Sequence, residues 1–281
     1  MAKNVLFEIG LEELPARFID DAQTQLENKT INWLEEKRIS YTSIQTFSTP
    51  RRLAILIQGM DENQATIEEE AKGPAIKIAK DKDGNWTKAA IGFTRGQGKS
   101  VEDIYTNDIN GTTYIFVKKV IEGKPVTEIL PEFKSIIETI QFGKNMRWGE
   151  QSMRYARPIR WLVALYDNEV IPFEIAGVHT SNTSFGHRFL AASVTITNPL
   201  AYKEQMKDNF VIVDSKEREN LILQGIKQVE NQEKFSVPVD EDLLEEVKNL
   251  VEYPTVFVGS FEEEFLELPE QVLITSMKEH Q

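Results

Sequence analysis

The chain has 281 residues, of which 41% are hydrophobic and 27% charged, and it contains no cysteine. Such a composition is typical of a soluble globular protein of one or two domains, and it excludes disulfides, thiolate metal sites and thiol catalysis. The formal net charge is −13, but residues 201–281 hold 19 acidic and 8 basic residues, whereas residues 1–200 hold 26 and 24. A surface for nucleic acid is therefore expected in the first two-thirds of the chain.

The first sixty residues predict strands around one helix. Asn4–Gly10 is an apolar run typical of a buried strand. Pro15 can begin a helix, and the apolar stripe that follows it extends to about Arg38. Two further strands are predicted at Tyr41–Phe47 and Arg52–Gly59.

The next eighty residues predict two helices and a hairpin. Thr87–Arg95 is expected to form a short helix that ends before a pair of glycines. Asn110-Gly111 is a strong hairpin signal between strands at Asp103–Tyr105 and Thr113–Ile121. A second helix is predicted at Thr127–Ile140 because its isoleucines recur on one face.

The remaining elements continue this mixture. The expected strands are Trp161–Tyr166 and Val170–Ala176 in a hairpin around Asp167-Asn168, then Val194–Thr197, Phe210–Asp214 and Pro254–Phe261. The expected helices run from Asn198 to about Asn209, over Lys216–Glu233 with Ser215 as its cap, over Glu241–Val251, and from Pro269 to Gln281.

These elements predict an α+β fold with mixed, largely antiparallel sheets, flanking helices and two sub-domains. A polar stretch at Ser181–Ala192 places the division between residues 1–186 and 187–281. The last helix lacks a stop signal, so the chain is expected to continue beyond it. The sequence has neither a signal peptide nor an apolar run long enough to span a bilayer, so the expected location is cytoplasmic.

Residues 146–161, MRWGEQSMRYARPIRW, are here called the arginine segment. The segment and its flank hold five cations and three aromatic residues against one acid, Glu150; these are Lys144, Arg147, Arg154, Arg157 and Arg160, with Trp148, Tyr155 and Trp161. Guanidinium groups beside aromatic faces suit phosphate binding and base stacking. The alternative is a salt-bridge surface between domains or subunits, with both tryptophans in the core. The sequence leaves both readings open.

Two other cationic pairs are candidates for binding. His187-Arg188 lies between Phe185 and Phe189, and it can offer donors to a phosphate or a carboxylate. The simpler interpretation, which we favour, is that His187 caps a turn while both phenylalanines pack in the core. In Arg51-Arg52, alternation along a strand puts the side chains on opposite faces, so one can reach a ligand while the other pairs with an acid such as Glu8 or Glu12.

No catalytic residue and no metal site is predicted. Gly96–Ser100 resembles only the end of a phosphate loop, and its spacing and preceding strand are wrong. The three histidines show no helical i,i+4 pairing, and Glu12-Glu13 is explained more simply as charge in the first turn of a helix than as a catalytic or magnesium-binding pair. A hydrolase that uses His187 with Glu8 or Glu12 has no support from spacing.

Nine segments in order resemble the β subunit of the bacterial heterotetrameric glycyl-tRNA synthetase. They cover the chain from end to end: Phe7–Pro15, Thr49–Ala54, Lys72–Ile76, Lys88–Gly98, Asn145–Gly149, Ala156–Trp161, Phe185–Phe189, Leu243–Pro254 and Phe265–Gln281. The family's chain is longer, so this sequence is similar to its N-terminal portion, and an HD-hydrolase-type domain and an anticodon-binding domain would follow. One departure is Phe185, where the family often has an arginine.

The resemblance implies a part in charging tRNA(Gly) with glycine. In the family, a class II catalytic α subunit uses ATP and Mg²⁺, and the β subunit supplies tRNA binding within an α2β2 complex. The resemblance therefore implies no cofactor in this chain, no membrane, and the α subunit and tRNA(Gly) as partners. The tRNA-binding residues expected here are Arg51, Arg52, Lys144, Arg147, Trp148, Arg154, Tyr155, Arg157, Arg160, His187 and Arg188. The alternative function is a scaffold that docks on the catalytic subunit without binding RNA.

Overall fold

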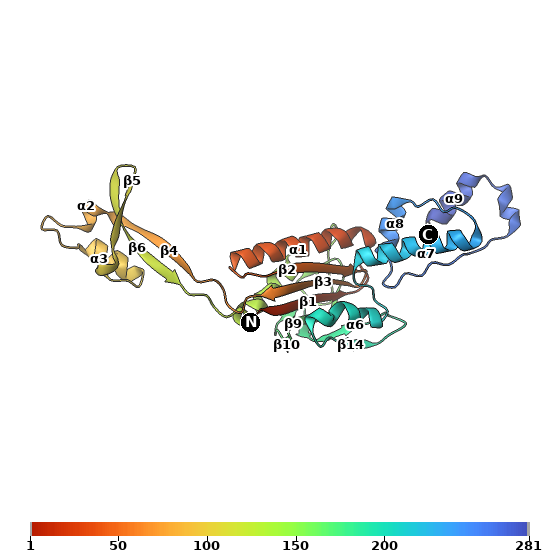
Figure 1. The fold of residues 1–281 in the computed structure, drawn as a ribbon, viewed down its shortest axis with the longest axis horizontal. Coiled ribbons are helices and arrows are strands. Elements are labelled where there is room, and N and C mark those ends of the chain that lie inside the picture. Colours follow the sequence, from red (N-terminus) through yellow and green to blue (C-terminus); the bar gives the residue numbers. More distant parts are fainter. Residues whose placement is uncertain (1, 280–281) are drawn as a thin grey trace. The chain divides into compact units, whose positions relative to one another are not determined.

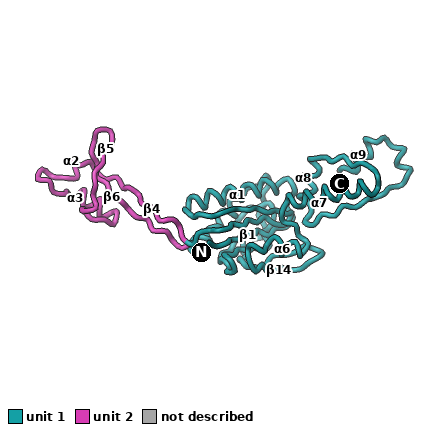
Figure 2. The backbone as a smooth tube through the Cα atoms, viewed as in Figure 1, with its two compact units in different colours: residues 1–62, 126–281 teal, residues 63–125 magenta. Residues whose placement is uncertain are grey.

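The computed structural model describes residues 2–279, which form two compact units (Figure 2). Unit 1 consists of residues 1–62 with 126–281, and unit 2 consists of residues 63–125. The predicted fold class, α+β with mixed and largely antiparallel sheets, is confirmed. The predicted division of the chain between residues 186 and 187 falls inside unit 1, and it stays a prediction.

The centre of unit 1 is a seven-stranded sheet made of β1 (Lys3–Leu11), β2 (Ser43–Thr49), β3 (Arg52–Met60), β9 (Ile159–Tyr166), β10 (Glu169–Val170), β11 (Glu174–Ile175) and β12 (Val178–Ser181). The order is β11-β12-β9-β1-β3-β2, with β10 also paired to β9. Only the pairing of β12 with β9 is parallel. The long strands are apolar almost throughout because both faces of the sheet are covered. The predicted hairpin around Asp167-Asn168 is confirmed, although its second strand ends at Val170.

One face of the sheet is covered by helices, as Figure 1 shows for α1 (Ile19–Glu36). A short 3₁₀ turn, η1 (Ala16–Phe18), leads into α1. The predicted helix Thr127–Ile140 is instead three short pieces, namely α4 (Val126–Ile129), η3 (Leu130–Phe133) and α5 (Lys134–Glu138). Pro131 explains the break, because proline has no N–H to donate and clashes with the preceding turn. Phe133 stacks on Phe7 of β1, with ring centroids 3.6 Å apart.

The opposite face of the sheet is covered by β13 (Thr183–Phe185), β14 (Ser193–Thr195), η4 (Pro199–Ala201) and α6 (Tyr202–Asp208). The predicted strand Phe210–Asp214 is wrong. Its valines are buried, but its backbone bonds to three different segments: the Val211 N–H donates to Met206, the Ile212 N–H donates to Glu252, and the Val213 carbonyl accepts from Ser48. The segment is therefore apolar because it packs on the sheet and not because it is a strand.

The rest of unit 1 is mainly helical: α7 (Ser215–Glu233), α8 (Glu241–Lys248), η5 (Glu263–Glu267) and α9 (Glu270–Glu279). Asp214, rather than the predicted Ser215, caps α7 by accepting from the N–H groups of Lys216 and Glu217. The predicted strand Pro254–Phe261 is wrong, since no described strand pairs with it. The predicted final helix is confirmed as far as residue 279, and residues 280 and 281 lie outside the described part.

Unit 2 is a three-stranded antiparallel sheet with short helices. Its elements are β4 (Ile67–Ala75), α2 (Ile76–Ala79), α3 (Lys88–Gly96), η2 (Val101–Asp103), β5 (Tyr105–Ile109) and β6 (Thr112–Ile121). The predicted turn is confirmed, with positive φ at both Asn110 (51°) and Gly111 (80°), as a two-residue hairpin requires. The small core of unit 2 comprises Ala79, Ala90 and Ile115.

Candidate nucleic-acid interface

The arginine segment contains a two-stranded hairpin that the sequence did not predict. β7 (Met146–Arg147) pairs with β8 (Arg154–Tyr155), and Arg147 lies directly opposite Arg154. Paired residues of adjacent strands project on the same face, and like charges placed there destabilise the pair. Both arginines are exposed, and no carboxylate among residues 2–279 forms an ion pair with either of them. The hairpin therefore carries two positive charges on paired residues, and no described carboxylate forms an ion pair with either of them.

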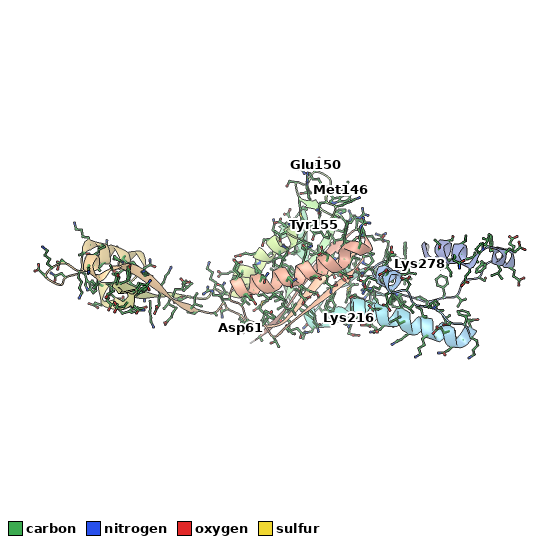
Figure 3. The ribbon with its side chains drawn as sticks, turned by 90° about the horizontal axis from the view of Figure 1, so that it is seen from above. Asp61, Met146, Glu150, Tyr155, Lys216 and Lys278 are labelled. Carbon is green, nitrogen blue, oxygen red and sulfur yellow. The ribbon has the colours of Figure 1, made fainter. Side chains whose placement is uncertain are left out.

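The hairpin is held in place by its aromatic residues. Tyr155 is 2% exposed and packs edge-on against Phe142 in the core of unit 1, with ring centroids 4.8 Å apart. The Trp148 Nε1–H donates to the Tyr155 carbonyl at 3.0 Å, which ties the loop to β8. In Figure 3 the loop carries Glu150 at its outer end, whereas Tyr155 lies nearer the body of unit 1. The predicted surface stacking role of Tyr155 is therefore incompatible with its position in the core, and Trp148, which is half-buried, keeps an accessible face.

A small cavity lies beside this hairpin. It has a volume of about 210 Å³ and is lined mainly by Trp148, Met153, Tyr155 and Ile159, with Arg157 at its edge. That volume is smaller than the roughly 300–1,000 Å³ of sites for drug-sized ligands, so the cavity has room for one ring system at most. An aromatic wall beside a guanidinium group is the chemistry that binds an unstacked nucleobase.

The other cations of the arginine segment are already engaged. Arg160 forms an ion pair with Glu12 at 3.3 Å, and the Arg157 Nε–H donates to the Glu13 carbonyl at 2.8 Å. Arg188, from another part of the chain, pairs with both Glu12 (3.3 Å) and Glu13 (2.9 Å). The segment is thus divided into a hairpin whose arginines have no acidic partner among residues 2–279 and a second part in which Arg160 pairs with Glu12 and Arg157 is bonded to a backbone carbonyl. These ion pairs lie within unit 1 and not between the two units, and contact of the segment with RNA stays a prediction.

Arg52 is fully buried and belongs to a polar cluster inside unit 1 that also contains Glu8, Ser184 and Glu252. Its guanidinium group lies 3.0 Å from the Glu252 carboxylate and 3.7 Å from that of Glu8. Burial lowers the pKa of Arg52, but the two carboxylates outweigh burial, so that its pKa is raised. The predicted pairing of one arginine with Glu8 is therefore present. Arg52 cannot contact an RNA at the surface, because its side chain is 0% exposed.

The buried cluster is completed by hydroxyl groups and by Arg51. Ser184 and Tyr202 each donate to Glu8 at 2.5 Å, and the Trp161 indole N–H also donates to it. Burial raises the pKa of Glu252, but Arg52 and the Thr49 hydroxyl outweigh burial and hold that pKa below its ordinary value. Arg51 lies 3.6 Å from Glu252, with 14% of its side chain exposed. The Arg51 side chain is therefore mostly enclosed in this cluster, and little of it is accessible at the surface.

The His187-Arg188 turn differs from our preferred interpretation. The His187 N–H donates to the Asn209 carbonyl, and the His187 carbonyl accepts from Leu190, so the residue does organise a turn. The phenylalanines on either side, however, are not in the core, since Phe185 is 39% and Phe189 84% exposed. The prediction of core packing is therefore wrong for Phe189, whereas the partly exposed Phe185 packs against the buried Trp161 of β9, with ring centroids 5.0 Å apart.

Sequence reasoning missed Glu252 and Arg218 as partners of the buried cluster. Arg218, on α7, donates to the carbonyls of Ser48, Ile212 and Lys248. The one signal was Glu252 itself, an acid within the apolar run Leu250–Tyr253. Among the described residues, no three His, Asp or Glu side chains are placed to hold a metal ion. Within the same range, no helix is long and apolar enough to cross a bilayer.

Comparison with known proteins gives a consistent result. The family model described as glycyl-tRNA synthetase beta subunit matches residues 5–281. A glycine–tRNA ligase beta subunit from Oceanobacillus iheyensis is 62% identical over 281 residues, which cover all of this chain and 41% of that protein. The proteins of the same name from Halalkalibacterium halodurans and Bacillus subtilis are 55% and 51% identical over 279 residues, or 99% of this chain. The chain thus spans about two-fifths of the length of these relatives, with 40% of the former and 41% of the latter covered.

Proposed function

The chain belongs to the glycyl-tRNA synthetase beta subunit family, and from this membership we propose that it contributes tRNA binding and subunit assembly to a cytoplasmic glycine–tRNA ligase. In this proposal a separate catalytic α subunit of an α2β2 complex charges tRNA(Gly) with glycine. ATP and Mg²⁺ are used by that subunit, and the present chain supplies no catalytic residue. Its part is to hold the RNA and the catalytic subunit together.

The observation that carries the RNA-binding proposal is the pair Arg147 and Arg154. The two residues lie directly opposite each other in an exposed hairpin, and neither has an acidic partner in the described chain. Repulsion between them disfavours the free hairpin, and a phosphate placed between them removes that repulsion. Trp148 follows Arg147 directly, so an aromatic face for stacking lies next to the phosphate site. Lys144, also exposed, adds to the same positive field.

The experiment is aminoacylation by the α/β enzyme with Arg147 and Arg154 both replaced by Gln. We expect the KM for tRNA to rise at least tenfold, because hydrogen bonds to charged groups contribute about 1.5–3 kcal/mol each. The matched control is K216Q/K227Q, which removes two exposed cations from α7. A KM for tRNA that is the same in both double variants would contradict the proposal.

The competing function is a docking scaffold that binds the catalytic subunit but not RNA. Tryptophan and arginine are favoured anchors of protein interfaces, so the same hairpin suits that role. Size-exclusion chromatography of the chain with the catalytic subunit, and separately with tRNA, discriminates between the two functions. Comigration with the subunit alone would favour the scaffold, and comigration with tRNA alone would favour RNA binding.

A further inference from the structure

Unit 2 concentrates exposed positive charge on β4, on α2 and α3, and on the turn between these helices. Residues 72–99 hold seven basic and two acidic residues, whereas the rest of unit 2 holds three basic and seven acidic ones. The helices α2 and α3 contact each other and β4, and they share one small core, so their side chains belong to one part of the unit (Figure 1). The exposed cations found there are here called the lysine surface, and they are Lys72, Lys77, Lys80, Lys82, Lys88 and Arg95.

The lysine surface has no acidic partners in the described chain. None of its six cations forms an ion pair with a carboxylate among residues 2–279. Of the two acids within residues 72–99, Asp81 is engaged elsewhere, because its carboxylate accepts from the backbone N–H groups of Asp83 and Asn85. Unit 2 therefore keeps a group of exposed cations without ion-pair partners in a chain whose net charge is −13.

The lysines on the strand β6 of the same unit show the opposite arrangement. Lys119 of β6 lies directly opposite Glu69 of β4, and Lys118 lies opposite Glu70. The Lys118 ammonium group is also 3.6 Å from the Glu68 carboxylate. Opposite charges on paired strand residues stabilise a sheet, so the fold of unit 2 explains these two lysines. The cations of the lysine surface have no such explanation.

The helix α3 carries two residues that its own stability does not favour. Lys88 is its first residue, where the helix dipole disfavours a cation, and no acid lies in that first turn. Gly92 lies in the middle of the helix, although a Cβ added there would meet no described side chain within 4 Å and alanine would favour the helix. Helical spacing puts Gly92 on the same exposed face as Lys88 and Arg95. A glycine between two cations allows a phosphate backbone to approach the helix closely.

Two aromatic rings hold lysines of this surface in place. The Lys72 Nζ lies 3.6 Å from the centroid of the Tyr114 ring, and the Lys80 Nζ lies 4.7 Å from that of the half-buried Trp86. Such contacts orient the ammonium groups before a ligand arrives. Because a lysine already covers one face of each ring, the rings position cations here and do not stack on bases. Contacts of this kind recognise phosphates and carry no sequence information.

We propose that the lysine surface binds the phosphate backbone of RNA, whatever its nucleotide sequence, as a second contact in addition to the hairpin β7–β8. The inference rests on the proposed function in one respect, namely that the RNA is tRNA. A polyanion suits this surface better than a protein does, because lysine is depleted in protein interfaces whereas lysine contacts to phosphate dominate nucleic-acid affinity. Unit 2 is thereby assigned a function that is separate from that of unit 1.

The first test is the tRNA affinity of the complete α/β enzyme that carries K88Q/R95Q, measured over a range of salt concentrations. Affinity should fall about tenfold at about 0.15 M salt, and the slope of log K against log salt concentration should decrease by about 1.4–1.8. The matched control is K118Q/K119Q, which removes two exposed cations of the same unit that face glutamates. Equal tRNA affinities for the two double variants would overturn the inference.

The melting temperature of K88Q/R95Q shows whether these cations are structural. It should not fall, because both side chains are exposed and lack acidic partners in the described chain. A clear fall would show that Lys88 and Arg95 stabilise the protein itself, and it would overturn the inference.

The second test is acetylation of lysines by acetic anhydride in the complete α/β enzyme, with and without tRNA, read by mass spectrometry. Lys77, Lys82 and Lys88 should react readily in the free enzyme and at least fivefold more slowly with tRNA bound. Lys119 is the control, and its rate should not change. If the first three lysines react slowly without tRNA, another part of the protein covers the lysine surface and the inference is overturned.

Three results separate this inference from the proposed function. Loss of tRNA affinity in R147Q/R154Q but not in K88Q/R95Q would overturn the inference and leave the proposed function standing. Loss in K88Q/R95Q alone would support the inference and contradict the role proposed for the hairpin β7–β8. Failure of the unaltered enzyme to bind tRNA would overturn both.

Discussion

Two pairs of arginines in unit 1 have opposite surroundings. Arg52 and Arg218 are 0% exposed and are bound by carboxylates or carbonyl oxygens below the central sheet. Arg147 and Arg154 are exposed on the hairpin β7–β8 and face each other without an acidic partner in the described chain. The first pair stabilises the fold, whereas the second leaves positive charge available to a ligand. The partners of an arginine, and not the density of arginines in the sequence, therefore indicate its use.

The cost of burial sharpens this contrast. Burial lowers the pKa of Arg218 to about 10, with partial compensation from Glu252 and Asp214, so the group stays charged at neutral pH. Three backbone carbonyls accept from Nε and Nη1 of this buried group and offset part of its burial, whereas its Nη2 has no hydrogen-bond partner among the described residues. The hairpin arginines remain hydrated and carry no such cost, and each is therefore free to exchange water for a phosphate.

The largest expected effect is loss of stability on removal of a buried guanidinium group. R52M leaves the Glu8 carboxylate buried without a cationic partner and Glu252 with Arg51 alone, so the free energy of unfolding should fall by about 3–5 kcal/mol. Guanidinium chloride denaturation of the full chain measures this. The same change on the hairpin, R154M, should alter it by less than about 0.5 kcal/mol. Equal losses in the two variants would remove the distinction between the pairs.

A charge reversal on the hairpin should move stability and RNA affinity in opposite directions. R147E places a carboxylate opposite Arg154, which should stabilise the hairpin by about 0.2–1 kcal/mol. The same change should weaken tRNA binding at least tenfold, because one phosphate contact is lost and Arg154 is neutralised. Fluorescence anisotropy with labelled tRNA and a thermal melt of the same sample measure both effects. Unchanged RNA affinity would show that the two like charges at Arg147 and Arg154 do not serve tRNA binding.

Two carboxylates interact between α1 and α8, namely Asp20 and Glu245. Asp20 is exposed as a whole residue, but partial desolvation of its carboxylate, together with Glu245, raises its pKa to about 6 from an ordinary value of 3.8. Asp20 by itself therefore contributes stability at low pH that is lost as pH rises from about 4 to 6, whereas Glu245, whose pKa the hydrogen bond to Asp20 lowers, contributes in the opposite sense. Melting temperatures across this window should show the unaltered chain losing stability relative to D20N. The matched control is D21N, which makes the same substitution at the neighbouring and likewise exposed position.

The smallest expected effect is a gain of RNA affinity from E12Q. Glu12 neutralises Arg160 and Arg188 at the surface, and such exposed ion pairs contribute at most about 1 kcal/mol to stability. Its removal should therefore change the melting temperature little. It should also free part of the positive charge next to the hairpin, so that tRNA affinity rises about twofold to threefold. A fall in affinity would indicate that the ion pairs position the RNA site.

Local patterns predicted the elements that have one dominant signal. The buried strands β1 and β3, the helix α1 and the turn at Asn110-Gly111 all follow from apolar runs, periodicity or turn chemistry. The strand predictions at 210–214 and 254–261 failed because an apolar run does not reveal whether a neighbouring strand exists. The hairpin β7–β8 was not predicted, since strands of two residues have no periodicity.

The sequence predicted which residues gather in the candidate site, but it did not predict which acids pair with its arginines. The sequence indicates where cations and aromatic residues gather, but Arg52 meets Glu252 across a separation of 200 residues, which no local pattern contains. In the same way, Arg160 of β9 pairs with Glu12, which directly follows the neighbouring strand β1, and Arg154 has no carboxylate partner among the described residues. The difference between a structural and an available arginine therefore depends on tertiary contacts.

The most direct test of the account is the salt dependence of tRNA affinity. Each phosphate contact adds about 0.7–0.9 to the slope of log K against log salt concentration. If Arg147 and Arg154 each hold a phosphate, R147Q/R154Q in the α/β enzyme should reduce that slope by about 1.4–1.8, and K216Q/K227Q should leave it unchanged. A slope that is the same in R147Q/R154Q and in the unaltered enzyme would contradict the central claim.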